Sequence, residues 1–141
     1  MTFINKKLNN KIEIVVGKLN LNSNIDKAWS DLSIDFLNAV YLEINKNSSN
    51  RKYSDLITFG FWCRKSNLNN LKLNYQNKYK MFGRGNVLHI TPSNASMNFA
   101  FSLAMGLLSG NSNIVRLPNR VFLQTKILCN IIKKLIKNHF L

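Results

Sequence analysis

Two short polar segments, each at the end of an apolar run, carry the side chains best suited to chemistry. Thr91-Pro92-Ser93-Asn94 follows the run Val87–Ile90, and Arg116 lies near the end of a second β-branched run that leads to Asn119. Hydroxyls, side-chain amides and a guanidinium donate hydrogen bonds to phosphates and other oxyanions. If both runs are parallel strands, these donors meet at one edge of a sheet, where open α/β sheets bind their ligands.

The spacing of apolar and turn residues predicts the elements that position these donors. It predicts strands over Val87–Ile90 and Asn113–Leu117 with a helix over Ala95–Leu108 between them. Ser109-Gly110-Asn111 ends that helix with residues that tolerate a left-handed backbone, and Pro118 opens a last amphipathic helix. Strand, helix and strand in this order predict a parallel pair with a right-handed crossover. The fold class is therefore α/β.

The first half of the chain is predicted to be mainly helical. A helix is expected from Asn24, where Ser23 and Asp26 have the spacing of a capping box, and a second helix follows a polar loop. The predicted elements are a strand at Ile12–Val16, helices at Asn24–Ile44 and Asp55–Leu71, the loop Asn45–Arg51 and a short strand at Tyr79–Phe82.

Composition excludes several classes of protein. With 45% hydrophobic residues among 141, the chain can bury a core, so it is not an intrinsically disordered protein. Cys63 and Cys129 are far apart and have no histidine cluster nearby, which excludes a disulfide scaffold and a zinc ribbon. The uncharged stretch around residues 87–115 is broken by Pro92 and several asparagines, so it is not a membrane span. The start of the sequence shows no charged region followed by an apolar core, so no signal peptide is predicted and we expect a cytoplasmic protein.

The charge is strongly one-sided. The chain carries 20 Lys and Arg against 6 Asp and Glu, a net charge of +14, and residues 56–141 contain no acid. Such a segment attracts phosphate, in a nucleic acid, a nucleotide or coenzyme A. The aromatic residues lie in apolar runs and do not alternate with Lys and Arg, so no stacking platform for nucleic acid is predicted.

The amino-acid sequence of the polar segments resembles the cofactor-binding segment of the aldehyde dehydrogenase superfamily. Within it, Gly85–Asn94 and Leu107–Pro118 are most similar to the LuxC-type fatty-acyl-CoA reductases. The resemblance implies an aldehyde dehydrogenase-like fold, in which N-terminal helices are followed by a βαβα half of a Rossmann-like domain. Residues 1–78 would be an N-terminal helical segment, and residues 79–141 the first part of the NADP-binding α/β domain.

The resemblance also implies a reaction. A cysteine thiolate attacks an acyl-CoA thioester, and hydride from NADPH releases the acyl group as an aldehyde. Asn94 matches the amide that holds the thioester oxyanion, and Thr91 and Ser93 match positions that line the cofactor cleft. Arg116 matches the basic residue beside the adenosine ribose, and Asn119 replaces an acid that would repel a 2′-phosphate. Homo-oligomers or acyl-transfer proteins are the partners implied.

The chain lacks the rest of that machinery. The nucleophilic cysteine of the family matches neither Cys63 nor Cys129 and is expected beyond residue 141. The last helix has no stop signal, and a helix that is apolar all round needs more cover than two strands provide, so we expect an N-terminal portion of a larger enzyme. A fragment of an NAD(P)-dependent aldehyde dehydrogenase and a basic nucleic-acid-binding module are the alternatives.

Simpler structural interpretations exist for the same residues. By residue type, Asn94 is a helix N-cap and Arg116 a solvated strand end. His89 is expected to be a hydrogen-bonded core histidine, and Cys63 a small core residue.

We expect the isolated 141-residue chain to produce no aldehyde from acyl-CoA and NADPH and to bind NADPH only weakly, because no residue matches the nucleophile. Measuring NADPH oxidation and aldehyde formation by the purified chain checks this. Measurable NADPH-dependent aldehyde formation would contradict it.

Overall fold

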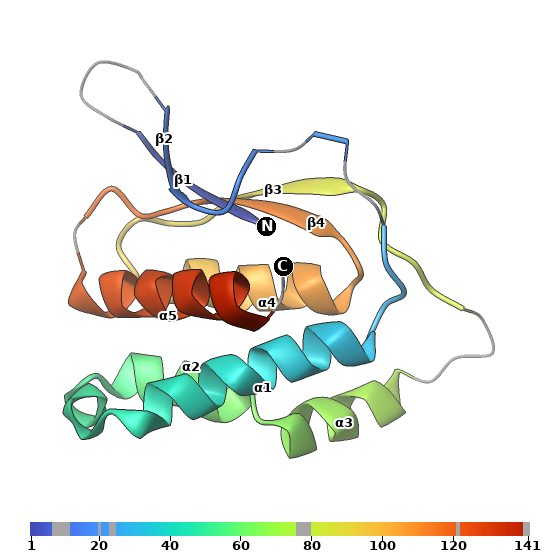
Figure 1. Ribbon diagram of the computed structural model, residues 1–141, viewed down its shortest axis with the longest axis horizontal. Helices are drawn as coiled ribbons and strands as arrows, with labels where there is room; N and C mark the ends of the chain where they lie inside the picture. The colour runs from blue at the N-terminus through green and yellow to red at the C-terminus, as the bar shows by residue number, and fades with distance from the viewer. Residues whose placement is uncertain (7–11, 20, 23–24, 76–79, 121, 140–141) are drawn as a thin grey trace.

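The computed structural model describes residues 1–6, 12–19, 21–22, 25–75, 80–120 and 122–139. Over those ranges the chain has four strands, five α-helices and one short 3-10 helix, and the helices lie on one side of the sheet (Figure 1). Their bounds are β1 Thr2–Lys6, β2 Ile12–Val16, α1 Asp31–Lys46, η1 Ser48–Lys52, α2 Ser54–Trp62, α3 Lys65–Asn74, β3 Asn86–Ile90, α4 Asn98–Leu108, β4 Ser112–Arg116 and α5 Leu123–His139.

The sheet has the strand order β2-β1-β4-β3. The strands β3 and β4 are parallel, with Ile90 opposite Arg116, which confirms the predicted parallel pair and the α/β class. The strand β1 was not predicted; it lies parallel to β4 and antiparallel to β2. The strand predicted at Ile12–Val16 is confirmed as β2, and its hairpin with β1 joins the same sheet as β3 and β4.

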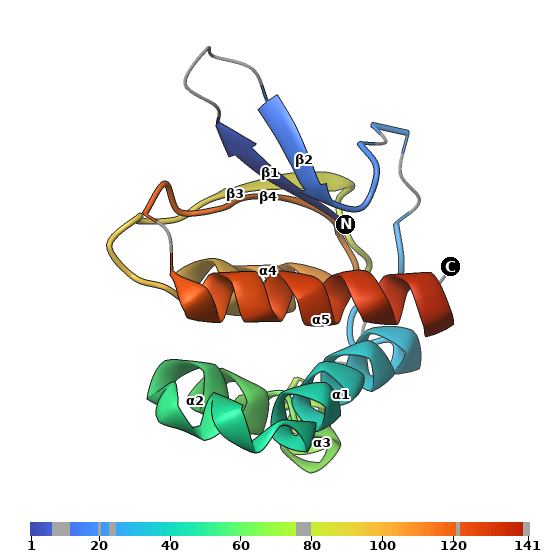
Figure 2. The ribbon, with the colours of Figure 1, turned by 60° about the vertical axis from the view of Figure 1, so that its left-hand side comes forward.

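The molecule has three layers (Figure 2): the sheet, then α4 and α5, then α1, α2 and α3. Alternate strand residues point to opposite faces of the sheet. Phe3 and Val115 are fully buried, whereas Leu88 and Ile90 are 56% and 63% exposed on the face that carries no helix. The helices cover one face of the sheet and leave the other open.

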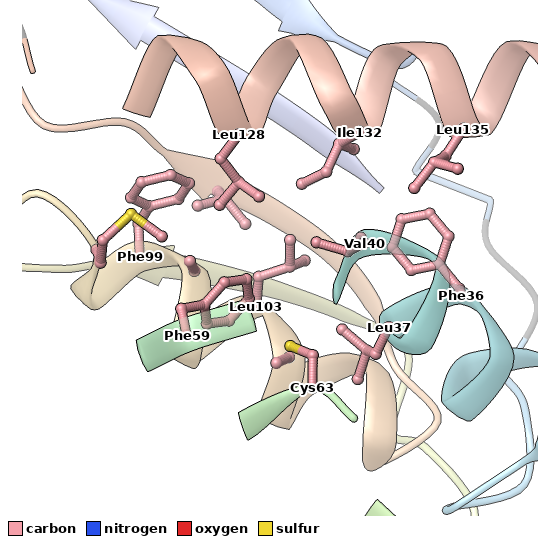
Figure 3. Packing of buried hydrophobic residues seen from close by; sticks show 14 of the residues in the cluster. Phe36, Leu37, Val40, Phe59, Cys63, Phe99, Leu103, Leu128, Ile132 and Leu135 are labelled. Atoms are coloured by element: carbon pink, nitrogen blue, oxygen red, sulfur yellow. The ribbon is translucent and has the colours of Figure 1, made fainter. Parts of the chain in front are cut away.

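The interior is built where α5 meets α1 and α4 (Figure 3). Leu128, Ile132 and Leu135 recur at helical spacing along α5 and are buried. Ile132 and Leu135 point towards Val40 and Phe36 of α1, and Leu128 lies nearer Phe99 and Leu103 of α4. Each such side chain contributes about 1.5–3 kcal/mol when it is fully buried. This contact confirms the apolar face predicted for the last helix.

The helix α4 lies in the middle layer, which explains its composition. It packs on β3 and β4 on one side and on α1 on the other, and Phe99, Ala100, Leu103 and Ala104 are buried. α4 is apolar on all its faces, and the face turned away from the sheet is therefore buried in large part by the N-terminal helices of this chain.

The helix predicted over Asn24–Ile44 corresponds to α1, which starts later than predicted, at Asp31. Ser30 is its N-cap and accepts a hydrogen bond from the backbone N–H three residues later at 3.3 Å. Trp29 has a φ of 57°, in the left-handed region, so a helix cannot pass through it. The expected cap at Ser23 lies outside the described residues.

The single helix predicted over Asp55–Leu71 is two helices, α2 and α3, separated at Arg64, whose backbone is extended with ψ 136°. After this break α3 packs on α1, where Leu68 is fully buried. The backbone N–H of Lys65 donates to Asn38 Oδ1 at 2.9 Å, so a contact with α1 stabilises the new helix start.

Other predicted boundaries also move. α4 begins at Asn98, three residues later than predicted, and α5 begins at Leu123, five residues later. The polar loop predicted after α1 contains η1. Of the strand predicted over Tyr79–Phe82, Tyr79 is not among the described residues, and Phe82 forms only an isolated bridge with Lys27.

Close backbone contacts hold the edge of the sheet where β3 and β4 begin. Gly110, which ends α4 as predicted, has a φ of +79°. Its carbonyl accepts from the N–H of Asp26 at 2.9 Å, and the Asp26 carbonyl accepts from the N–H of Gly83 at 3.0 Å. A side chain at Gly110 would overlap the Asp26 carbonyl, so glycine is required by both conformation and space.

A buried polar network joins β3, β4 and α4. His89 is 9% exposed, with Nδ1 2.7 Å from Ser102 Oγ and Nε2 2.8 Å from Asn113 Oδ1. Asn113 Nδ2 donates to the Asn111 carbonyl, so Asn113 Oδ1 is the acceptor of the bond with His89 and Nε2 is its donor. The other ring nitrogen is hydrogen-bonded to the Ser102 hydroxyl. This arrangement confirms His89 as a hydrogen-bonded core histidine.

We expect Gly106→Ala to destabilise the protein, although alanine is a better helix former than glycine by about 1 kcal/mol. The added methyl group would overlap Asn113 Oδ1 and lie 2.9 Å from His89 Nε2. Overpacking of this kind costs about 1–3 kcal/mol, and here it also disturbs the buried network.

Urea unfolding should show a loss of about 2 kcal/mol for Gly106→Ala. The matched control is Met105→Ala, one residue away at a position 46% exposed, which should change the free energy of unfolding by less than about 1 kcal/mol. A stabilised Gly106→Ala protein would contradict the close packing of α4 on the sheet.

Candidate functional site

The two predicted polar segments leave the same edge of the sheet. In the parallel pair, Leu88 lies opposite Ile114 and Ile90 opposite Arg116, so both strands end at the same level. The loop of residues 91–97 then leads down to α4, and the loop of residues 117–122 leads to α5 (Figure 1). The register of β3 and β4 therefore brings to one end of the sheet two loops that α4 and β4 separate in the sequence.

Asn94 does not cap α4. The helix starts at Asn98, and its N-cap is Met97, which makes no side-chain capping bond. The Asn94 side chain is exposed and makes no hydrogen bond with any described residue. Its amide is therefore available to a ligand, and the interpretation of Asn94 as a helix cap is wrong.

Asn94 borders a hollow of about 410 Å³ between α2, α4 and the start of α5. Two phenylalanine rings, Phe101 and Phe122, contribute apolar surface to its lining. The polar lining consists of hydroxyl, amide and carboxylate groups from Ser54, Asp55, Thr58, Asn94, Ser96 and Asn98. A carbonyl group that enters this hollow can approach the Asn94 amide.

Thr91 and Ser93 lie in the same loop as Asn94 but differ in exposure. Thr91 is half-buried at the end of β3, whereas Ser93 is exposed. Both residues therefore lie in the loop that follows the end of β3, and neither belongs to α4.

Arg116 lies on the open face of the sheet, in one row with Ile4 and Ile90. It is half-buried, and its Nη2 atom lies 3.5 Å from Asn119 Oδ1. The two side chains therefore lie next to each other across the turn between β4 and α5. Arg116 makes no ion pair with any described acid.

A second hollow, of about 260 Å³, opens at the turn after β4. Asn119, Arg120 and Lys126 contribute polar lining, and Phe122 contributes an aromatic ring. No acid is among the residues that line it, and Arg120 and Lys126 give the hollow a positive charge. No sequence pattern points to Arg120 or Phe122, because their place beside Asn119 depends on how the chain folds after β4.

A family model described as acyl-CoA reductase (LuxC) matches residues 27–138, which is well over half of the 141-residue chain. The chain belongs to the LuxC acyl-CoA reductase family. The match contains both loops and leaves out the hairpin of β1 and β2. No curated protein and no solved structure gives a significant match.

Membership of the LuxC family indicates a reductase, and the residues at the strand edge fit a phosphorylated nucleotide by their chemistry. Arg116 offers a guanidinium that has no ion pair with a described acid, and Asn119 beside it offers an amide where a carboxylate would repel phosphate. Among the described residues, no group of three or more His, Cys, Asp and Glu could hold a metal ion. None of the described helices has the length and hydropathy that a membrane crossing requires.

Neither cysteine is suited to be the nucleophile of a LuxC reductase. Cys63 is fully buried and Cys129 is 4% exposed, and neither lies in the loops at the strand edge. Burial raises the pKa of the Cys63 thiol far above its usual value and raises the pKa of Cys129 to about 12, despite the nearby charge of Lys133. Both therefore remain protonated thiols at neutral pH.

We expect neither thiol of the folded chain to react with a thiol reagent at pH 8, because burial both blocks access and suppresses the thiolate. The measurement is the rate of reaction with Ellman's reagent with and without urea. The urea-unfolded chain should release two equivalents, one for each cysteine. Fast reaction of either cysteine before unfolding would contradict this assignment.

Proposed function

We propose that this chain is the N-terminal part of an NADPH-dependent acyl-CoA reductase, in which an acyl-CoA is converted to an aldehyde through a cysteine thioester. On this proposal, residues 79–141 are the first part of the NADP-binding domain, and the nucleophile lies on a part of the enzyme outside this chain. The observation that carries the proposal is the register of Ile90 with Arg116 in the parallel pair of β3 and β4, which brings the two donor loops to one end of the sheet.

Arg116 and Asn119 would hold the 2′-phosphate end of the cofactor. The guanidinium supplies charge and several donors, and the Asn119 amide adds another donor without introducing a negative charge. The absence of acid in residues 56–141 supports a preference for the additional phosphate of NADPH.

Asn94 would bind the carbonyl oxygen of the acyl thioester. Its amide N–H groups are positioned by the loop before α4 and are free of other described partners. Negative charge grows on that oxygen during both thiolate attack and hydride delivery, and a preorganised donor is worth about 3–4 kcal/mol in such a transition state. The bound NADPH supplies the hydride.

The proposal is tested through the weak ligand binding expected of the isolated chain. Adding 2′,5′-ADP to 15N-labelled protein should shift the amide resonances of Arg116 and Asn119, and 5′-AMP should have a smaller effect because it lacks the 2′-phosphate. Arg116→Gln should weaken 2′,5′-ADP binding about tenfold, the size of a lost charge-assisted hydrogen bond.

Arg84→Gln is the matched control for Arg116→Gln, because Arg84 is an exposed cation just before β3, near the opposite edge of the sheet. It removes the same charge and should leave 2′,5′-ADP binding nearly unchanged. Equal losses in the two variants would indicate attraction by net charge alone and would overturn the assigned site.

A further inference from the structure

We propose that Asp55 is a positioning residue for the loop that carries Asn94, an inference that rests on the proposed function. Asp55 lies in the first turn of α2, in the outer helical layer and far in sequence from either donor loop. Its role would be to hold the oxyanion donor at the correct place above the hollow it shares with Asn94.

The Asp55 carboxylate joins three elements. Its Oδ2 atom accepts a hydrogen bond from the Ser96 hydroxyl, two residues after Asn94. Gln124 Nε2, in the first turn of α5, lies 3.3 and 3.4 Å from the two carboxylate oxygens. The backbone N–H of Leu56 donates to Oδ1 at 2.9 Å and fixes the carboxylate at the start of α2.

Ser96 is held from both sides. Its hydroxyl donates to Asp55, and its carbonyl accepts from the Thr125 hydroxyl of α5 at 2.9 Å. Among the described residues of the loop at 91–96, Ser96 is the one with side-chain hydrogen bonds to other elements. The position of Asn94 relative to the rest of the site therefore depends on this polar anchor, on the buried side chain of Met97 and on the end of β3.

The charge of Asp55 suits this role. Asp31, Asp35 and Glu43 pair with lysines, whereas Asp55 has no ion pair with a described residue and is bound by hydroxyl, amide and backbone donors. Hydrogen bonds to an ionised acceptor are stronger than neutral ones. An amide at this position has one acceptor oxygen, so it cannot accept from Ser96, Gln124 and Leu56 on two oxygens as a carboxylate does.

The test compares Asp55→Asn, Ser96→Ala and the double variant in the 141-residue chain. The matched control is Asp35→Asn, which removes the same charge from an exposed ion pair with Lys65. Two readouts are recorded: exchange of the backbone amides of residues 95–97, and the shifts that NADPH causes in the Asn94 side-chain amide and in the backbone amides of the two loops.

We expect Asp55→Asn and Ser96→Ala each to raise amide exchange at residues 95–97 about tenfold and to abolish most of the NADPH-induced shift at Asn94. The shifts at Arg116 and Asn119 should remain as in the wild type, which loss of overall structure would not allow. The double variant should resemble Asp55→Asn, because the bond that Ser96→Ala removes is one of those that Asp55→Asn already disturbs.

The outcomes separate this inference from the proposed function. If NADPH shifts neither loop in the wild type, the proposed function fails and the inference falls with it. If NADPH shifts both loops in the wild type and Asn94 responds equally in Asp55→Asn, Asp35→Asn and Ser96→Ala, only the positioning role of Asp55 is wrong.

Discussion

The parallel pairing of β3 with β4 is the constraint on which the rest of the structure depends. Parallel strands need a crossover, and here the crossover is α4, so the helix must pack on the two strands that it connects. The same pairing makes both strands end at one level, since Ile90 lies opposite Arg116. One backbone register therefore brings both donor loops to the same end of the sheet, with no direct hydrogen bond between their described residues.

The polar network under the sheet makes that register specific. His89 of β3 bonds to Asn113 of β4 and to Ser102 of α4, so a slip of either strand would leave buried polar atoms without partners. Gly106 allows α4 to approach this network closely, because any side chain there would occupy the space of Asn113. The apolar core stabilises the layers, and this network fixes how the layers are aligned.

The distribution of charge follows the same layering. The acids lie in the first 55 residues, and Asp31, Asp35 and Glu43 pair with lysines on the helical side of the molecule. The end of the sheet at Arg116 is left positively charged. Asp55 is the acid that contacts a donor loop, because its carboxylate accepts a hydrogen bond from the Ser96 hydroxyl. Attraction for an anionic ligand and anchoring of the Asn94 loop are thus carried by different parts of the chain.

The sequence by itself determined the α/β class, the parallel pair, the turn at Gly110 and the two donor segments, because these features depend on local periodicity and turn chemistry. Only the tertiary structure decided that β1 joins the sheet, that a break at Arg64 divides the predicted second helix, and that Asn94 lies free of α4. These outcomes depend on contacts with segments far away in the sequence. The link from Asp55 to Ser96 spans 41 residues, and no local pattern records a bond of that kind.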